Sequence, residues 1–83
     1  MSNHIRAHIR LTNQAEVISF IQSLSKFNDN FTIENRDGVH RVNAKSVIGV
    51  MYTMFDFPED MFLINETHDG LIPSFVDAYR MPE

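Results

Sequence analysis

The segment RVNAKSVIGVM, residues Arg41–Met51, passes from a polar stretch around Asn43 to an apolar stretch that starts at residue 47. Ser46 lies at the change. Serine is among the residues that best begin a helix, because its hydroxyl accepts a hydrogen bond from a free backbone N–H. We therefore expect a short helix that begins after Ser46 and ends at Tyr52 or Met54.

Two extended segments precede this helix. Residues 4–11, HIRAHIRL, alternate between polar and apolar and predict a half-buried strand with its histidines and arginines facing solvent. Residues 31–35 alternate in the same way and predict a second strand. Asp37 and Gly38 then indicate a hairpin turn, because both residue types tolerate positive φ. Residues 39–42 are the predicted partner strand of this hairpin.

Another helix is predicted between these strands. Asn13 and Glu16, three residues later, resemble a capping box at a helix start. The helix should end near Phe27, because the asparagines and aspartate that follow favour turns. The apolar residues at helical spacing between these ends are Val17, Ile18, Phe20, Ile21 and Leu24.

The last third of the chain predicts one more strand and one more helix. Residues 61–67 alternate as a strand, and Pro73 suits the first turn of a helix, where its missing N–H is not needed. Phe75, Val76 and Tyr79 would then face the sheet. The order β-α-β-β-α-β-α predicts an α+β fold, a two-layer open-faced sandwich with a four-stranded, mainly antiparallel sheet and three helices on one face.

Composition limits the classes of protein that fit. The chain has 83 residues, so residues 1–83 are expected to form a single domain. Its hydrophobic content of 43% predicts a folded core rather than disorder. The net charge of −4 argues against nucleic-acid binding, since a nucleic-acid binder of this size usually shows a basic stripe.

The chain contains no cysteine and no long apolar run. Without cysteine there are no disulfides, which agrees with a cytoplasmic location. No segment approaches the ~18–20 apolar residues of a membrane helix, so membrane insertion is not expected. The first ten residues lack the apolar core of a signal peptide.

The length, the predicted order of elements and the segment VNAKSVIGVM, residues 42–51, together resemble the HPr family, the small phosphocarriers of the bacterial sugar phosphotransferase system. The resemblance is sharp in this segment, moderate over residues 19–34, and weak after Asp56. It implies an HPr-like fold for the whole chain.

The resemblance also implies that the carrier reaction is lost. HPr proteins carry a phosphoryl group on a histidine in a G-[LI]-H-x-R-P-type motif at the start of the first helix. When the first helix of the family is aligned without gaps with the predicted first helix of this chain, the histidine position falls on Asn13. The arginine position then falls on Ala15 and the proline position on Glu16. Asparagine cannot accept the phosphoryl group, Ala15 removes the cationic clamp, and Glu16 puts negative charge where phosphate would sit. The chain therefore resembles a Crh-like, nonenzymatic paralog without the active-site histidine.

A second site implied by the resemblance is Ser46. It matches the serine that an ATP-dependent HPr-type kinase phosphorylates in many Gram-positive bacteria. Val47, Ile48 and Met51 match the apolar helix face on which family partners dock, and Lys45 could steer an acidic partner or a phosphate. The implied partners are the kinase and a transcriptional regulator or metabolic enzyme. No cofactor is implied, and the sequence leaves the oligomeric state open.

Two alternatives remain. The pattern H-x-R occurs at His4/Arg6 and His8/Arg10, so a displaced His8 could act as the phosphocarrier, although alternation places it in a strand. Alternatively, the chain is a structural or interaction domain in which Ser46 is only a helix cap. A metal site is not expected, because His4 and His8 would lie about 13 Å apart along a strand.

Overall fold

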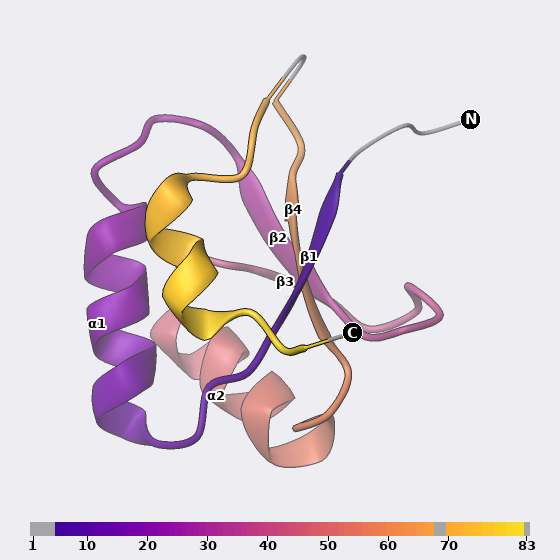
Figure 1. Ribbon diagram of the computed structural model, residues 1–83. Coiled ribbons are helices and arrows are strands. Elements are labelled where there is room, and N and C mark those ends of the chain that lie inside the picture. Colours follow the sequence, from indigo (N-terminus) through magenta and orange to yellow (C-terminus); the bar gives the residue numbers. More distant parts are fainter. Residues whose placement is uncertain (1–4, 68–69, 83) are drawn as a thin grey trace.

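A computed structural model describes residues 5–67 and 70–82 of the chain (Figure 1). Within these two stretches, four strands and three helices follow one another in the predicted order. They are β1 (Arg6–Ile9), α1 (Gln14–Leu24), β2 (Phe31–Glu34), β3 (Arg41–Asn43), α2 (Val47–Asp56), β4 (Met61–Asn65) and the 3-10 helix η1 (Ser74–Tyr79).

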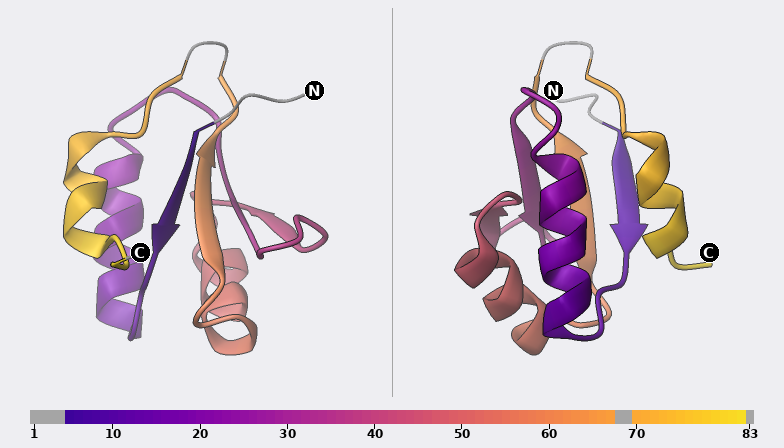
Figure 2. Two further views of the ribbon diagram at one scale, coloured as in Figure 1. Left: turned by 45° about the vertical axis from the view of Figure 1, so that its right-hand side comes forward. Right: turned by 90° about the vertical axis from the view of Figure 1, so that its left-hand side faces the viewer.

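The four strands form one open sheet in the order β1-β4-β2-β3, and each of their pairings is antiparallel. β4 is therefore central: Ile64 lies opposite Arg6 on one side and Thr32 on the other. The helices α1, α2 and η1 cover one face of the sheet (Figure 2). The predicted α+β class, with an antiparallel open sheet and three helices, is confirmed.

The core lies between the helices and the inner face of the sheet. Helices have to bury an apolar stripe and strands one face, so every element contributes at its own spacing. Phe20 of α1 is fully buried, with its ring centroid 5.5 Å from that of Phe75 and 5.1 Å from that of Tyr79. The other large core side chains with almost no exposed surface are Ile9, Leu11, Val17, Leu24, Ile33, Val50, Met61, Leu63 and Val76.

Among the described residues, two polar residues are buried with this core, Thr53 and Asn65. Asn65, at the end of β4, is 2% exposed. Its Nδ2 donates to Asp29 Oδ2 at 2.7 Å and to the Leu71 carbonyl at 2.9 Å, and its Oδ1 accepts from the Thr67 N–H at 2.9 Å. Asn65 therefore joins the loop between α1 and β2 to the segment between β4 and η1.

The C-terminal segment covers the outer edge of β1. The Arg10 N–H donates to the Tyr79 carbonyl at 2.8 Å, and the Met81 N–H donates to the His8 carbonyl at 2.9 Å. Ile9 and Arg80 form an isolated antiparallel bridge between these bonds. Two backbone groups at the C-terminal end of this edge strand are thus paired within the chain.

The first strand is shorter than residues 4–11. It spans Arg6–Ile9, and Ile5, which alternation assigns to the buried face, is exposed. His4 lies outside the described residues. Helix α1 ends at Leu24 instead of near Phe27, because the chain leaves the helix through a turn in which the Phe27 N–H bonds the Leu24 carbonyl. Ile18, which was predicted to belong to the apolar face of this helix, is more than one third exposed.

The predicted partner strand at residues 39–42 is displaced. The strand β3 is Arg41–Asn43, and Val39 is exposed in the loop before it. Gly38 has a positive φ of 78°, as a turn glycine should, but the Val39 N–H is taken by the Asp37 side chain at 3.0 Å. This local bond competes with strand pairing and widens the hairpin loop.

The alternating pattern predicted over residues 61–67 is wrong in the structure. β4 ends at Asn65, and all five of its residues are buried. A central strand has neighbours on both sides, and the outer face of this one is covered by long side chains. The His8 ring stacks on Phe62 at 4.4 Å, and the Arg6 guanidinium lies 4.1 Å from the centroid of the same ring. The view of His8 and Arg6 as simply solvated is therefore also corrected.

The last two helices differ in type or length from the prediction. α2 continues to Asp56, beyond the predicted end at Tyr52 or Met54. The final helix is a 3-10 helix over Ser74–Tyr79, and Pro73 precedes it as the cap residue. Val76 is buried, and Phe75 and Tyr79 pack against the core. The predicted sheet-facing side chains of this helix are thus confirmed.

Candidate functional site

Helix α2 begins at a surface serine. The Ser46 backbone is extended, with φ −95° and ψ 115°, and its Oγ accepts a hydrogen bond from the Gly49 N–H at 3.2 Å. Asn43 holds the turn before it, because its Oδ1 accepts from the Lys45 N–H and its carbonyl accepts from the Ser46 N–H. The predicted cap is confirmed, and it is formed by an exposed residue.

Gly49 allows the first turn of α2 to lie close to the sheet. A Cβ at this position would lie 3.2 Å from Val42 Cβ and 3.4 Å from Ser46 Oγ. The first distance is shorter than the optimal carbon–carbon separation of about 3.5–4.0 Å. The closeness of α2 to Val42 therefore explains a glycine inside a helix, where it is otherwise unfavourable.

The outward face of α2 is apolar. Ile48 is 83% exposed, Tyr52 57% and Phe55 71%, and they recur at the i, i+4, i+7 spacing that places side chains on one helix face. Val50, Thr53 and Met54 occupy the inward face and are buried. The hydroxyl of Tyr52 bonds the Asp56 carboxylate, which raises the pKa of Tyr52 above its usual value of 10.0.

We define the α2 face as the four exposed apolar side chains of this helix, Val47, Ile48, Tyr52 and Phe55. The structure thus places Val47 and Ile48 beside Ser46 on the surface, whereas Met51 is partly buried against the core. Sequence reasoning did not single out Tyr52, although the predicted helix reached it, and missed Phe55 because the predicted helix ended at Met54 at the latest. The same helical spacing, continued from Ile48, points to both residues.

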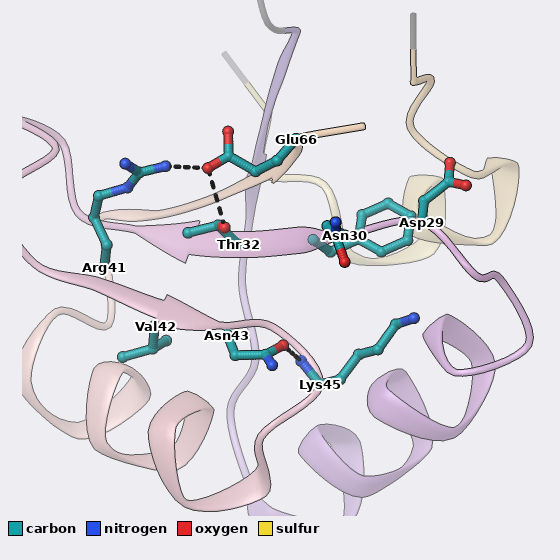
Figure 3. Close-up of a pocket in the computed structure, with 9 residues that line it drawn as sticks. Asp29, Asn30, Thr32, Arg41, Val42, Asn43, Lys45 and Glu66 are labelled. Carbon is teal, nitrogen blue, oxygen red and sulfur yellow. Dashed lines mark hydrogen bonds and ion pairs between the residues drawn. The ribbon is translucent and has the colours of Figure 1, made fainter. Parts of the chain in front are cut away.

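Figure 3 shows a polar groove beside the start of α2, with a volume of about 460 Å³. The Lys45 side chain extends along it, and its Nζ donates to the Phe27 carbonyl at 2.6 Å. Lys45 thereby ties the start of α2 to the turn after α1, and its role in partner binding stays a prediction. The residues that line the groove are Asp29, Asn30, Phe31, Thr32, Arg41, Val42, Asn43, Lys45 and Glu66.

The positive charge at the groove rim is neutralised within the chain. Arg41 forms an ion pair with Glu66 and lies 3.3 Å from a Glu34 carboxylate oxygen, and Glu66 also accepts from the Thr32 hydroxyl (Figure 3). The other Glu34 oxygen lies 3.5 Å from Arg6 Nε. Arg41 is therefore already paired with two carboxylates on the outer face of the sheet.

At the start of α1, the Glu16 carboxylate provides negative charge from the chain itself. Asn13 Oδ1 accepts from the Glu16 N–H at 2.8 Å, which confirms the predicted cap. The Glu16 carboxylate accepts from both the N–H and the hydroxyl of Thr12, each at 2.7 Å. In a capping box this carboxylate would bond the N–H of the cap residue itself. Ala15 is exposed beside them and offers no polar atom in its side chain.

Replacing Glu16 with glutamine is expected to reduce the free energy of unfolding at neutral pH. The bonds from the Thr12 hydroxyl, the bond from the Thr12 N–H and the nearby charge of Arg10 hold the pKa of Glu16 below its ordinary value of 4.5. Because the folded-state pKa is lowered, the stabilisation is present above the unfolded-state pKa and is lost as pH falls through the folded-state pKa. Urea unfolding should therefore separate the two proteins at neutral pH and less below pH 4.5. A pH-independent difference would contradict the charge argument.

His8 lies far from any helix start of this kind. Its neighbours Ala7 and Ile9 are fully buried, so the His8 side chain lies on the opposite face of the sheet from the helices. Its Nε2 is 2.8 Å from the Glu59 carbonyl oxygen, which can only accept, so Nε2 carries the proton. The structure therefore does not bring His8 together with Asn13 or Ser46.

The described residues contain neither a metal-ligand cluster nor a membrane-spanning helix. In residues 5–67 and 70–82, no three histidine, cysteine, aspartate or glutamate side chains converge in a way that could hold a metal ion. No helix in the same part of the chain is both long and apolar enough to cross a membrane. The polar groove and the α2 face remain as the features on which function can be argued.

Comparison with known proteins does not assign the chain to a family. No protein-family model matches the sequence, no curated protein matches it, and no solved structure matches the fold. The candidate site is therefore defined by its own geometry: a serine-capped helix, with an exposed apolar face that starts at the cap.

Proposed function

We propose that this chain is an HPr-like regulatory protein that acts through protein–protein contacts and catalyses no reaction itself. Its docking surface would comprise Ser46, the adjacent Val47 and Ile48, and the edge of Met51, with Lys45 at the start of the helix. The observation that carries the proposal is that an exposed serine cap lies two residues before an isoleucine with 83% of its surface exposed. A single modification there would change the chemistry of the docking surface without altering the core.

The start of α2 suits a phosphoserine. The first turn of α2 contains no acidic residue, so its free N–H groups and the positive end of the helix dipole are not compensated by a carboxylate. A phosphate on Ser46 would add about −1.5 to −2 charges at this end, where negative charge stabilises a helix. Modification would therefore leave α2 folded and alter only its surface.

The start of α1 supports the loss of the carrier reaction. The Asn13 side chain is used as a helix cap, and an amide is not a nucleophile for phosphoryl transfer. The Glu16 carboxylate adds negative charge beside the N–H groups with which a phosphate would otherwise bond. A phosphoryl group at this position would meet repulsion in place of an arginine clamp.

Incubation of the chain with an HPr-type kinase and ATP is expected to add one phosphate, located at Ser46. The matched control is Ser46→Asn, because asparagine caps a helix about as well as serine but has no hydroxyl to modify. Ser46→Ala should also stay unmodified, with a loss of about 1 kcal/mol of stability from the missing cap. Intact mass, followed by fragmentation to locate the phosphate, gives the readout.

The control reaction is the same kinase with an ordinary HPr. If that protein gains phosphate and this chain does not, the regulatory proposal fails and Ser46 is only a helix cap. Phosphate on Ser46→Asn would equally contradict it, since another residue would then be the acceptor. The partner proposed to read the modified surface is a transcriptional regulator or a metabolic enzyme.

A further inference from the structure

The α2 face is large for an uncovered surface of a small protein. Fully exposed aromatic side chains present about 150–250 Å² each, and Tyr52 and Phe55 both expose more than half of theirs. With Ile48 and Val47, the face amounts to roughly 500 Å², in the upper half of the roughly 300–600 Å² of the largest apolar patch on a typical monomer, and such a patch is often functional. A two-fold pair of such faces would bury on the order of 1,000 Å², which is at the low end of specific interfaces.

The ends of α2 carry uncompensated charge of opposite sign. No acidic residue lies in the first turn, and no basic residue lies in the last turn. Asp56 instead ends the helix, where the negative end of the helix dipole makes a carboxylate unfavourable. Among the described residues, no basic side chain forms an ion pair with Asp56. Asp56 accepts a bond from the Tyr52 hydroxyl and Ser46 caps the Gly49 N–H, but within the described part of the chain each end lacks a charged partner of opposite sign.

We infer that two copies of this chain dimerise through antiparallel packing of their α2 faces about a two-fold axis near Tyr52. Ile48 of one copy would pack against the partner subunit's Phe55, and the two Tyr52 rings would meet at the axis. Asp56 would lie beside the free N–H groups at the start of the partner subunit's α2. An isologous contact of this kind repeats every pairing twice.

The spacing of the three side chains suits this arrangement. Ile48 and Phe55 are seven residues apart, or about 10.5 Å at 1.5 Å per residue, and Tyr52 lies between them. Reversing one helix against the other therefore brings Ile48 to the level of the partner subunit's Phe55. Helix axes at 8–10 Å would bring these side chains into contact.

The dimer would also be a means of regulation, and this regulatory role alone rests on the proposed function. A phosphate on Ser46 would lie close to the partner subunit's Asp56, and like charges across an interface oppose association. Modification would then release the α2 face for another protein. Dimerisation itself requires neither the kinase nor any relation to HPr, so the two proposals can fail separately.

Sedimentation equilibrium on the full chain tests the dimer. The monomer mass is 9.6 kDa, and the small interface predicts dissociation in the micromolar to millimolar range. We expect the weight-average mass to rise towards twice the monomer value as the concentration approaches about 1 mM. Phe55→Ser should keep the protein monomeric. Leu71→Ser is the matched control, because Leu71 is 70% exposed and belongs to the segment between β4 and η1, which lies at the opposite end of the molecule from α2 (Figure 1).

A charge exchange tests the antiparallel orientation. Ser46→Asp keeps a good helix cap but faces the partner subunit's Asp56, and Asp56→Lys faces the positive end of the partner subunit's α2. Each single variant should weaken dimerisation by roughly ten-fold or more. The double variant pairs opposite charges and should recover most of the lost affinity. Circular dichroism checks that every variant stays folded.

Three results would overturn the inference. The first is a monomer at every concentration up to about 1 mM. The second is a dimer that Leu71→Ser abolishes and Phe55→Ser does not. The third is a dimer that Phe55→Ser abolishes but whose double charge variant is as weak as the single variants, because α2 would then not be antiparallel.

Discussion

Phe20→Ala is expected to lower the free energy of unfolding by about 3–5 kcal/mol, as truncation of a buried phenylalanine usually does. Phe20 is fully buried and is the ring that links α1 to η1, through its contacts with Phe75 and Tyr79. A domain of 83 residues typically has a total stability of about 4–12 kcal/mol. The substitution therefore removes a large share of it, and urea unfolding followed by circular dichroism measures the loss.

The matched control is Phe55→Ala, which removes the same atoms from a ring that is 71% exposed. Its effect on the free energy of unfolding should stay within about 0.5 kcal/mol, as for surface substitutions in general. Because the two substitutions are chemically identical, comparing them separates the loss of core packing from the loss of an exposed ring on the α2 face. Equal losses in the two variants would mean that the rings are not placed as described.

The second large effect is expected for Asn65→Ala, with a loss of about 2–3 kcal/mol, because buried polar groups left without partners are costly. The substitution removes the donor to Asp29 and Leu71 and the acceptor for the Thr67 N–H. The loop before β2 and the segment after β4 then lose their common attachment. Thermal unfolding at neutral pH gives the first measure.

Hydrogen exchange can locate the damage from Asn65→Ala. The Thr67 amide should exchange faster in the variant, because its side-chain acceptor is gone. Asn28→Ala provides the comparison, since Asn28 is an exposed asparagine in the loop between α1 and β2. If both alanine variants unfold at the same denaturant concentration, the network at Asn65 does not contribute to stability.

Sequence patterns predicted the starts of α1 and α2 better than the bounds of the strands. The caps at Asn13 and Ser46 depend on a side chain and an N–H three residues away, so a local pattern contains the whole interaction. The place of β3 depends on how the Asp37 side chain competes for the Val39 N–H, and the residue types alone do not decide that competition. The strand β3 therefore begins at Arg41, later in the chain than the predicted strand at residues 39–42.

Burial in β4 shows a second limit. Alternation in a sequence indicates which residues prefer solvent, but Phe62 is covered by Arg6 and His8 from β1, a strand distant in sequence. For the candidate site, the segment around Ser46 identified the start of the exposed face. Its continuation to Phe55 required the true length of α2, which packing of Val50 and Met54 against the core determines.

The position of β4 between β1 and β2 means that the sheet cannot grow in the order in which the ribosome makes it. β1 is synthesised first, but its partner in the sheet comes after both long helices, since Arg6 pairs with Ile64. Until β4 emerges, α1, α2 and the β2–β3 hairpin can form from local contacts, but β1 has no partner strand. Pairings so distant in sequence slow folding, and the waiting strands have unpaired edges that favour aggregation. A nascent or truncated chain without β4 would hold two separate pieces in place of a smaller sheet.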